Sequence, residues 1–235
     1  MGRERQSAKA RHDPTAILPA DVMLPRPRLD GSCSLASALR LRRTTREIGD
    51  RPLPPQVLSD LLWAACGVNR RRGPFGLPGL TAASASNSQE INLFVAMADG
   101  AYRYEPRRHR LIAVALGDLR RLAIGRGQGG AGSSAPIRLI YVADLDRLAN
   151  TAGFQEPGLR DPAVQRSYYF VDTGLIAANV YLFAAATGLA AWFHNCDRPA
   201  LAAKLKLRAD QSPLFGQTVG YPARRGRAPP RPADR

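Results

Sequence analysis

The stretch PAVQRSYYFVDTGLIAANVYLFAAATG, residues 162–188, decides the fold. Pro162 suits the first turn of a helix, and Gly188 is the residue type at which helices commonly end. The spacing predicts the longest helix of the chain, over residues 163–187. Aromatic and aliphatic side chains lie on nearly every side of that helix, so we expect protein to bury it on nearly all sides. It is therefore predicted to be a central helix that also packs against a second subunit.

A membrane span is the alternative interpretation of so apolar a segment, because a span needs about 20 predominantly apolar residues. Gly174, Asn179 and Thr187 interrupt the apolar run, and Arg166 and Ser167 make its beginning polar. These interruptions favour a buried helix, and we expect no membrane partner.

Shorter elements flank this helix in the sequence. Ser34 can cap a helix that runs to about Arg42, and Pro55 can open a second helix that Gly67 ends. We read 69–79 as a loop, and expect helices at 117–124, 144–150 and 199–207 and strands at 91–98, 101–104, 111–115, 137–142, 190–194 and 214–219. Strands and helices mixed in this way, with one hairpin, predict an α+β fold.

The length of 235 residues fits one domain. We divide the chain into an extended arm over 1–30, a folded domain over 31–222 and a basic tail over 223–235. The formal net charge is +15, but residues 1–12 hold four basic residues against one acidic, and the tail holds five against one. Because about half of the excess lies at the ends, and basic residues do not alternate with aromatic ones, we expect no nucleic-acid partner.

The cysteines Cys33, Cys66 and Cys196 lie far apart, and the chain has no CxxC pair. An odd count with this spacing predicts neither a disulfide framework nor a metal site. The basic N-terminus is not followed by the apolar run of a signal peptide. Reduced thiols and the lack of a signal predict a cytoplasmic location.

The stretch Arg42-Arg43-Thr44-Thr45-Arg46 gathers three guanidinium groups and two hydroxyls at a helix end. Guanidinium groups bind phosphate oxygens in a planar, charged geometry, and hydroxyls add short hydrogen bonds. Taken alone, the stretch is more typical of a solvated basic helix end. Whether the stretch binds an anion depends on whether other segments supply the remaining contacts of such a site.

Residues 81–89, TAASASNSQ, are small and polar, which lets backbone N–H groups approach a ligand; an ordinary polar loop is the alternative. The glycine-rich residues 125–132 lack the order and the lysine of a P-loop, and we interpret them as a surface or lid segment.

Conventional catalytic sets are scarce in this chain. His12 and His109 stand in polar surroundings and are expected to be solvated. The run His194-Asn195-Cys196 allows a base beside a thiol, although coincidence at a strand end explains it better. A reaction that needs no side-chain acid or base, such as hydride transfer through a bound cofactor, fits this scarcity.

The order of these segments resembles the FMN-dependent nitroreductases, and most closely their SagB/ThcOx-type branch. The resemblance covers roughly residues 25–222. It rests on RRTTRE at 42–47, QVLSDLLWAACGVNR at 56–70, TAASASNSQEINLFVA at 81–96, AYRYEP at 101–106, APIRLIYVAD at 135–144, DTGLIAANVYLFAAATGLA at 172–190, DRPALAAKLKL at 197–207 and QTVGYP at 217–222.

The resemblance implies a mixed, mainly antiparallel sheet flanked by helices, and a homodimer with FMN at the subunit interface. It also implies ping-pong electron transfer from NADH or NADPH to a small organic acceptor, such as a nitroaromatic or a quinone. The phosphate and ribityl chain would be held by Arg42, Arg43, Thr44 and Arg46, and the flavin would be lined from the other subunit by Ser84, Asn87 and Gln89. Backbone near flavin N5 would come from His194 and Asn195, and Arg225 or Arg227 would close on the phosphate.

The chain departs from the family pattern at Leu80, at Ala83 and at His194-Asn195-Cys196, all of which the resemblance places at the flavin ring. The segment 147–167 is longer than expected and is a candidate for reshaping the substrate entrance. Two alternatives remain open at this point. One is a divergent, non-catalytic binding partner, and the other is an azoline-oxidising dehydrogenase of peptide modification.

Overall fold

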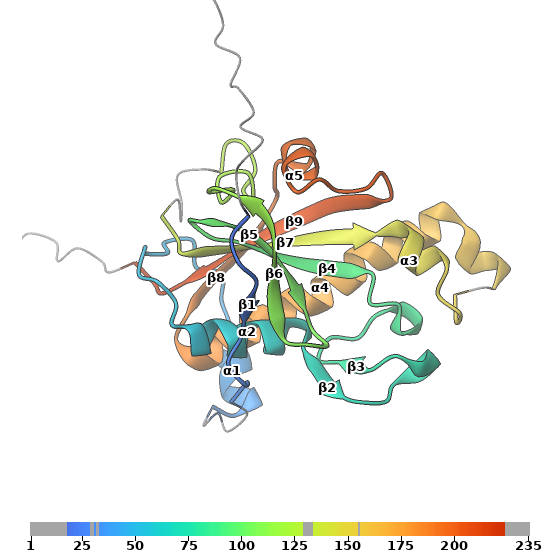
Figure 1. Cartoon of the computed structure of the whole chain (residues 1–235). Coiled ribbons are helices and arrows are strands. Elements are labelled where there is room, and N and C mark those ends of the chain that lie inside the picture. The colour runs from blue at the N-terminus through green and yellow to red at the C-terminus, as the bar shows by residue number, and fades with distance from the viewer. Residues whose placement is uncertain (1–17, 29–30, 32, 129–133, 155, 224–235) are drawn as a thin grey trace, which may run out of the picture.

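The fold is a seven-stranded antiparallel sheet with helices on both faces. We analysed a computed structural model, which describes residues 18–223 except 29–30, 32, 129–133 and 155 (Figure 1). The strand order is β1-β6-β5-β4-β7-β9-β8, and β2 and β3 form a separate two-stranded hairpin. The strands are β1 Val22–Met23, β2 Val68–Arg70, β3 Gly79–Leu80, β4 Ile91–Ala96, β5 Gly100–Glu105, β6 Arg110–Leu116, β7 Ile137–Asp144, β8 Ala190–His194 and β9 Gln211–Gly220.

The helices follow the sequence signals closely. They are α1 Leu35–Leu41, α2 Pro55–Cys66, α3 Leu145–Ala149, α4 Pro162–Thr187 and α5 Arg198–Lys204, with 3₁₀ turns η1 Pro74–Gly76, η2 Ala85–Asn87 and η3 Pro157–Arg160. Ser34 caps α1 through its side chain, and Pro55 is the first residue of α2. Gly188 ends α4 in the left-handed conformation, with φ of 71°. The α+β prediction is confirmed.

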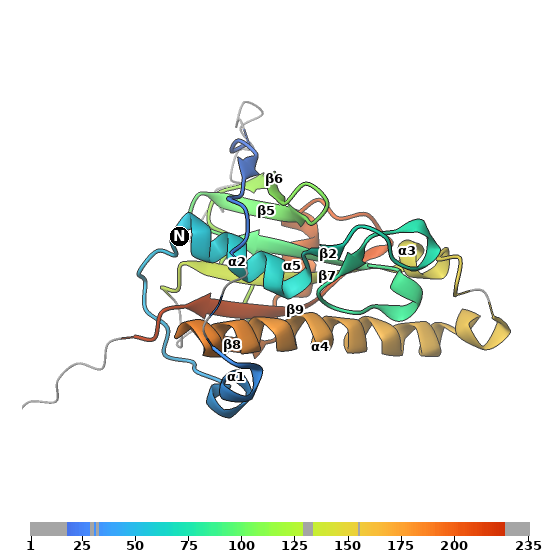
Figure 2. The same cartoon turned by 90° about the horizontal axis from the view of Figure 1, so that it is seen from below.

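Apolar residues of the central strands pack on both faces of the sheet. In β4, Leu93 and Val95 face the cluster that contains α2 and α4, whereas Phe94 and Ala96 face the cluster that contains α5. Strand β7 is buried over its whole length. Figure 2 shows α4 lying along one face of the sheet with α1 beneath it.

Helix α4 is buried by its own chain along one stripe only. The buried positions are Tyr169, Asp172, Thr173, Ile176, Ala177, Val180 and Ala184, which share one helical face. Phe170, Val171 and Leu175 are exposed by 36–56%. The expectation that protein buries this helix on nearly all sides is therefore not met within a single chain. By length and composition α4 could cross a membrane, a property that it shares with core helices of water-soluble folds.

Three sequence-based expectations are corrected. Residues 117–124 form a single turn instead of a helix, in which Leu122 N and Ala123 N both donate to the Leu119 carbonyl. Residues 69–79, predicted as a loop, lie within the β2–β3 hairpin, whose strands are Val68–Arg70 and Gly79–Leu80. His109 is half-buried instead of solvated, since its ring nitrogens bond Ser59 Oγ and Tyr104 Oη at 2.7 and 2.8 Å.

Candidate functional site

The arginine-rich segment Arg42–Arg46 leaves α1 and runs along the free side of β8. Its backbone is fixed there by Thr45 N, which donates to the Ala191 carbonyl at 3.0 Å. The last described residue returns to the same place, where Ala223 N donates to the Glu47 carbonyl at 2.9 Å. This corner of the sheet thus joins the arginine segment to residues that follow β9.

Aromatic rings support the side chains of this segment. The Arg42 guanidinium lies 5.6 Å from the ring centroid of Tyr181, and the Arg46 guanidinium 5.7 Å from that of Trp192. Tyr181 Oη shares a hydrogen bond of 3.1 Å with Thr44 Oγ1 and accepts one of 2.9 Å from Phe193 N. A single tyrosine of α4 therefore links the arginine segment to β8.

A cavity of about 260 Å³ opens beside these residues, lined by Arg43, Thr45, Tyr181 and neighbouring apolar groups. Arg42, Arg43 and Arg46 are exposed and form no salt bridge with any residue that the structure describes. Three uncompensated guanidinium groups beside hydroxyls and aromatic faces make a strong site for a phosphate or another anion.

The second predicted segment, Ser84–Gln89, forms a tight loop around η2. Its backbone is held in the left-handed region at Ser86, Asn87 and Gln89, with φ of 49°, 55° and 54°. Ser84 Oγ accepts from Gln89 N at 3.0 Å, and the Gln89 amide donates to the Pro78 carbonyl at 2.6 Å. Non-glycine residues in this region cost free energy and persist where their surroundings fix them.

A buried acid pair lies directly beneath this loop. Asp172 of α4 accepts a hydrogen bond of 2.8 Å from Ala85 N, and Ser88 Oγ donates to Glu90 Oε2 at 2.5 Å. Glu90 is fully buried, Asp172 is 3% exposed, and Glu90 Oε1 has no hydrogen-bond partner among the described residues. Burial, and then repulsion by Asp172, raises the pKa of Glu90 to about 8. Glu90 therefore keeps a proton at neutral pH, and Oε1 is the oxygen left to hold it.

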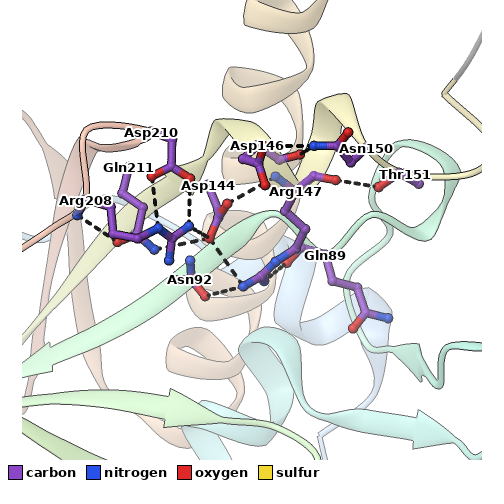
Figure 3. A network of polar contacts seen from close by, with 10 residues as sticks. All are labelled: Gln89, Asn92, Asp144, Asp146, Arg147, Asn150, Thr151, Arg208, Asp210 and Gln211. Atoms are coloured by element: carbon purple, nitrogen blue, oxygen red, sulfur yellow. Dashed lines mark hydrogen bonds and ion pairs between the residues drawn. The ribbon is translucent and has the colours of Figure 1, made fainter.

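An arginine network fixes the other end of the loop. Arg147 of α3 donates to the Gln89 carbonyl at 2.7 Å and to Asn92 Oδ1 at 3.3 Å, as Figure 3 shows. The buried Asp144 carboxylate lies 3.5 Å from Arg147 and 3.1 Å from Arg208. These contacts join the loop to α3 and to the start of β9, so its shape depends on groups distant in sequence.

The two predicted segments do not meet within one chain. The arginine segment contacts α4 at Tyr181, whereas the Ser84–Gln89 loop contacts it at Asp172. Nine residues of helix separate these positions, which is about 14 Å along the axis. A ligand held by both segments must span that length or bridge two protomers.

The remaining predicted site residues lie at the end of β8 and beyond. His194 is buried, its Nδ1 bonds the Asn195 carbonyl at 2.9 Å and its Nε2 bonds Thr218 Oγ1 at 2.8 Å. Burial lowers the pKa of His194 to about 4, so the ring is neutral. Burial also raises the pKa of Cys196 to about 11, which supports coincidence over a thiol–base pair. Arg225 and Arg227 lie outside the described residues.

Three polar residues of this region escaped prediction. Residue type alone predicts an apolar-face aromatic at Tyr181 and no site role for Glu90 or Asp172. The available signal is a lone carboxylate within a mostly apolar run, as in QEINLFVA at 89–96 and FVDTGLIAA at 170–178. A charge so placed must be neutralised or paired on folding.

Comparison with known proteins identifies the family. The model of the nitroreductase family matches residues 39–221. This chain belongs to the nitroreductase family, a family of oxidoreductases. A relative from Methanocaldococcus jannaschii, provisionally named as a nitroreductase, is 32% identical over 170 residues, which cover 66% of this chain and 75% of the relative.

Solved structures confirm the fold. A protein of Ralstonia eutropha JMP134, also provisionally named as a nitroreductase, is 35% identical with a TM-score of 0.73, covering 88% of this chain and 91% of that chain. The NADPH:FMN oxidoreductase of Vibrio harveyi, solved with NAD⁺, has a TM-score of 0.55 at 19% identity, covering 83% and 74% of the two chains. A chain of the Escherichia coli microcin synthetase complex McbBCD has a TM-score of 0.59 at 18% identity, covering 84% and 76%.

Proposed function

We propose that this protein is a homodimeric, FMN-dependent oxidoreductase that takes electrons from NADH or NADPH and passes them to a small organic acceptor by a ping-pong mechanism. The observation that carries the proposal is the cluster of Arg42, Arg43 and Arg46 beside the cavity at β8, where none of the three forms a salt bridge with a described residue. Family membership supports it, and so does the name of the Vibrio harveyi neighbour.

The residues present fit the phosphate end of FMN. A phosphate monoester carries a charge of about −1.5 to −2, and each hydrogen bond to a charged group contributes about 1.5–3 kcal/mol. Arg42, Arg43 and Arg46 would balance the charge, and the Thr44 hydroxyl adds a neutral partner. Bound FMN would supply two-electron redox chemistry, which side chains cannot provide.

The loop over Ser84–Gln89 would present backbone N–H groups and hydroxyls to the flavin of the partner protomer. Its left-handed backbone is held by Asp172 and Arg147 from beneath, so the loop is preorganised before any ligand binds. His194 would contribute through its backbone, since both ring nitrogens are already bonded within the chain.

A dimer would cover the apolar surface that one chain leaves exposed. Leu35, Leu39 and Leu41 of α1 are 54–66% exposed, and the outer face of α4 adds Phe170, Val171 and Leu175. Exposed apolar side chains gathered on two packed helices are what a protein interface would cover. A dimer would also allow the arginine segment of one chain and the loop of the other to act on one ligand.

Spectroscopy of the purified protein tests the proposal. We expect a flavin absorbance spectrum, or uptake of added FMN with one FMN per chain, and bleaching on anaerobic addition of NADH or NADPH. A protein that takes up no FMN would refute the flavin proposal. Flavin that binds but is not bleached by either nucleotide would refute NADH and NADPH as electron donors, and would favour a non-catalytic role or the azoline oxidation described next.

An azoline-oxidising dehydrogenase is the second candidate. It is favoured by the resemblance to the SagB/ThcOx-type branch and by the fold shared with a chain of the microcin synthetase complex, which was solved with truncated pro-MccB17 bound. Incubation of the FMN-loaded protein with an azoline-containing peptide separates the candidates. Loss of two mass units per ring would support this role, whereas turnover of NADH with a quinone alone would favour the first.

A further inference from the structure

A second cavity, of about 580 Å³, lies away from the arginine segment. It opens between the β2–β3 hairpin, the turn that joins β5 to β6 and the residues that follow α3. Figure 1 shows these two hairpins side by side. We call it the basic cavity, and its lining includes the apolar residues Phe75, Leu77, Leu80, Ile91 and Leu93 and the cations Arg103, Arg107 and Arg147. The volume suits a small organic ligand.

The charge of the basic cavity is uncompensated. Its one lining carboxylate, Glu105, is paired with Arg110 at 2.5 Å. Arg103 and Arg107 form no salt bridge with any residue in the described part of the chain. Arg147 is fixed by its bonds to Gln89 and Asn92 (Figure 3). In the described part of the chain, one anchored and two unpaired guanidinium groups therefore face a space of mixed lining, in which the apolar residues stand beside polar ones such as Ser88, Gln89 and Asn150.

Phe75 supplies a second, independent observation. It has φ of 56°, a left-handed conformation for an aromatic residue, and it is 55% exposed at the cavity. Asn87 Nδ2 donates to the Pro74 carbonyl at 3.1 Å and helps to hold this turn. A Cβ on Gly153 would lie 2.3 Å from Phe75 Cζ, so the ring packs directly on that glycine. Strained, exposed side chains that the surroundings fix in place are typical of ligand clamps.

We propose that the basic cavity binds a small organic acid with a planar apolar body, away from the arginine segment and beside the Ser84–Gln89 loop, whose Gln89 also lines the cavity. Bound FMN does not occupy this site. The apolar wall and the Phe75 ring would cover the body of such a ligand. Arg103 and Arg107 would bind its carboxylate, for which the planar guanidinium fork is suited. The proposal does not depend on redox activity.

Isothermal titration of the full-length protein with 2-naphthoate, with and without saturating FMN, tests the proposal. We expect saturable, one-to-one binding in both conditions, and much weaker binding of the neutral 2-naphthamide. Absence of saturable binding would overturn the proposal. Displacement of 2-naphthoate by FMN would also overturn it, because the probe would then report the flavin site.

Neighbouring arginines offer a matched control. Arg107 lines the basic cavity and Arg108 does not, although both are exposed in the same turn. Arg107→Gln and Phe75→Ala should each weaken 2-naphthoate binding, and Arg103→Gln combined with Arg107→Gln should weaken it roughly tenfold or more. Arg108→Gln should leave it unchanged. Both variants should keep the native circular dichroism spectrum. If Arg107→Gln and Arg108→Gln then lose equal affinity for 2-naphthoate, the probe responds to the general positive charge of the turn, and the proposed site is refuted.

Discussion

Replacement of Glu90 by Gln should remove a pH dependence of stability that the buried acid pair creates. Glu90 and Asp172 are both buried in the fold. Ser88 Oγ donates to Glu90 Oε2, and Glu90 Oε1 has no hydrogen-bond partner among the described residues. The pKa of Glu90 rises from 4.5 to about 8 in the fold. Between these values the folded chain keeps a proton that the unfolded chain releases. The free energy of unfolding must therefore fall as pH rises through this window.

The size of the effect follows from the same shift. One pKa unit corresponds to about 1.4 kcal/mol. The pKa shift of Glu90 therefore contributes at most about 5 kcal/mol to the free energy of unfolding, and most of this contribution is lost by pH 8. In Glu90→Gln the amide is neutral at every pH and can still accept from Ser88 Oγ. We expect this variant to resemble the wild type near pH 5 and to be the more stable of the two near pH 8.

Urea denaturation at fixed protein concentration, followed by far-UV circular dichroism from pH 5 to 9, measures the difference. Glu105→Gln is the matched control, because Glu105 is partly exposed and pairs with Arg110. The control should keep the wild-type slope between pH 5 and 8. Groups such as His109 titrate in the wild type and in both variants, so their contribution to the pH dependence cancels in the comparison. Parallel slopes in wild type and Glu90→Gln would refute the account of the acid pair.

Two further predictions concern single side chains. Arg147→Met should lower the free energy of unfolding by about 1–3 kcal/mol, because the Gln89 carbonyl and the buried Asp144 lose a charged partner, and a urea titration at pH 7 checks this. A loss indistinguishable from zero would show that the network of Figure 3 does not hold the loop. Among the thiols, only Cys33 should react quickly with a disulfide reagent at pH 7.5, because burial raises the pKa of Cys66 to about 12 and that of Cys196 to about 11. Fast reaction of more than one thiol per native chain would contradict that.

Local signals in the sequence predicted the framework well, because they depend on neighbours in the chain. Pro162 and Gly188 fixed the ends of α4, and Ser34 fixed the start of α1. The helix expected at 117–124 is only a turn, in which Leu122 N and Ala123 N share the Leu119 carbonyl. An apolar pattern over so short a segment does not show how many turns the backbone completes, because short helices depend on tertiary packing.

The candidate site was predictable as segments but not as an arrangement. Residue types alone pointed to Arg42–Arg46 and Ser84–Gln89. The left-handed turns of the loop could not be foreseen, because Asp172, 87 residues from Ala85, holds them. The roles assigned to the site residues all stay predictions, as does the homodimer; these residues are Arg42, Arg43, Thr44, Arg46, Ser84, Asn87, Gln89, His194, Asn195, Arg225 and Arg227.

Titration of FMN into the Arg42→Ala, Arg46→Ala double variant tests the central claim most directly. Both side chains are exposed and unpaired among the described residues, so their removal should leave the fold and the oligomeric state intact. Loss of at least two charge-assisted hydrogen bonds should weaken FMN binding by roughly a hundredfold or more. Arg40→Ala, two residues before Arg42 and within α1, is the control that should keep full affinity. Stoichiometric FMN at wild-type affinity in the double variant would contradict the account, because the phosphate would then bind elsewhere.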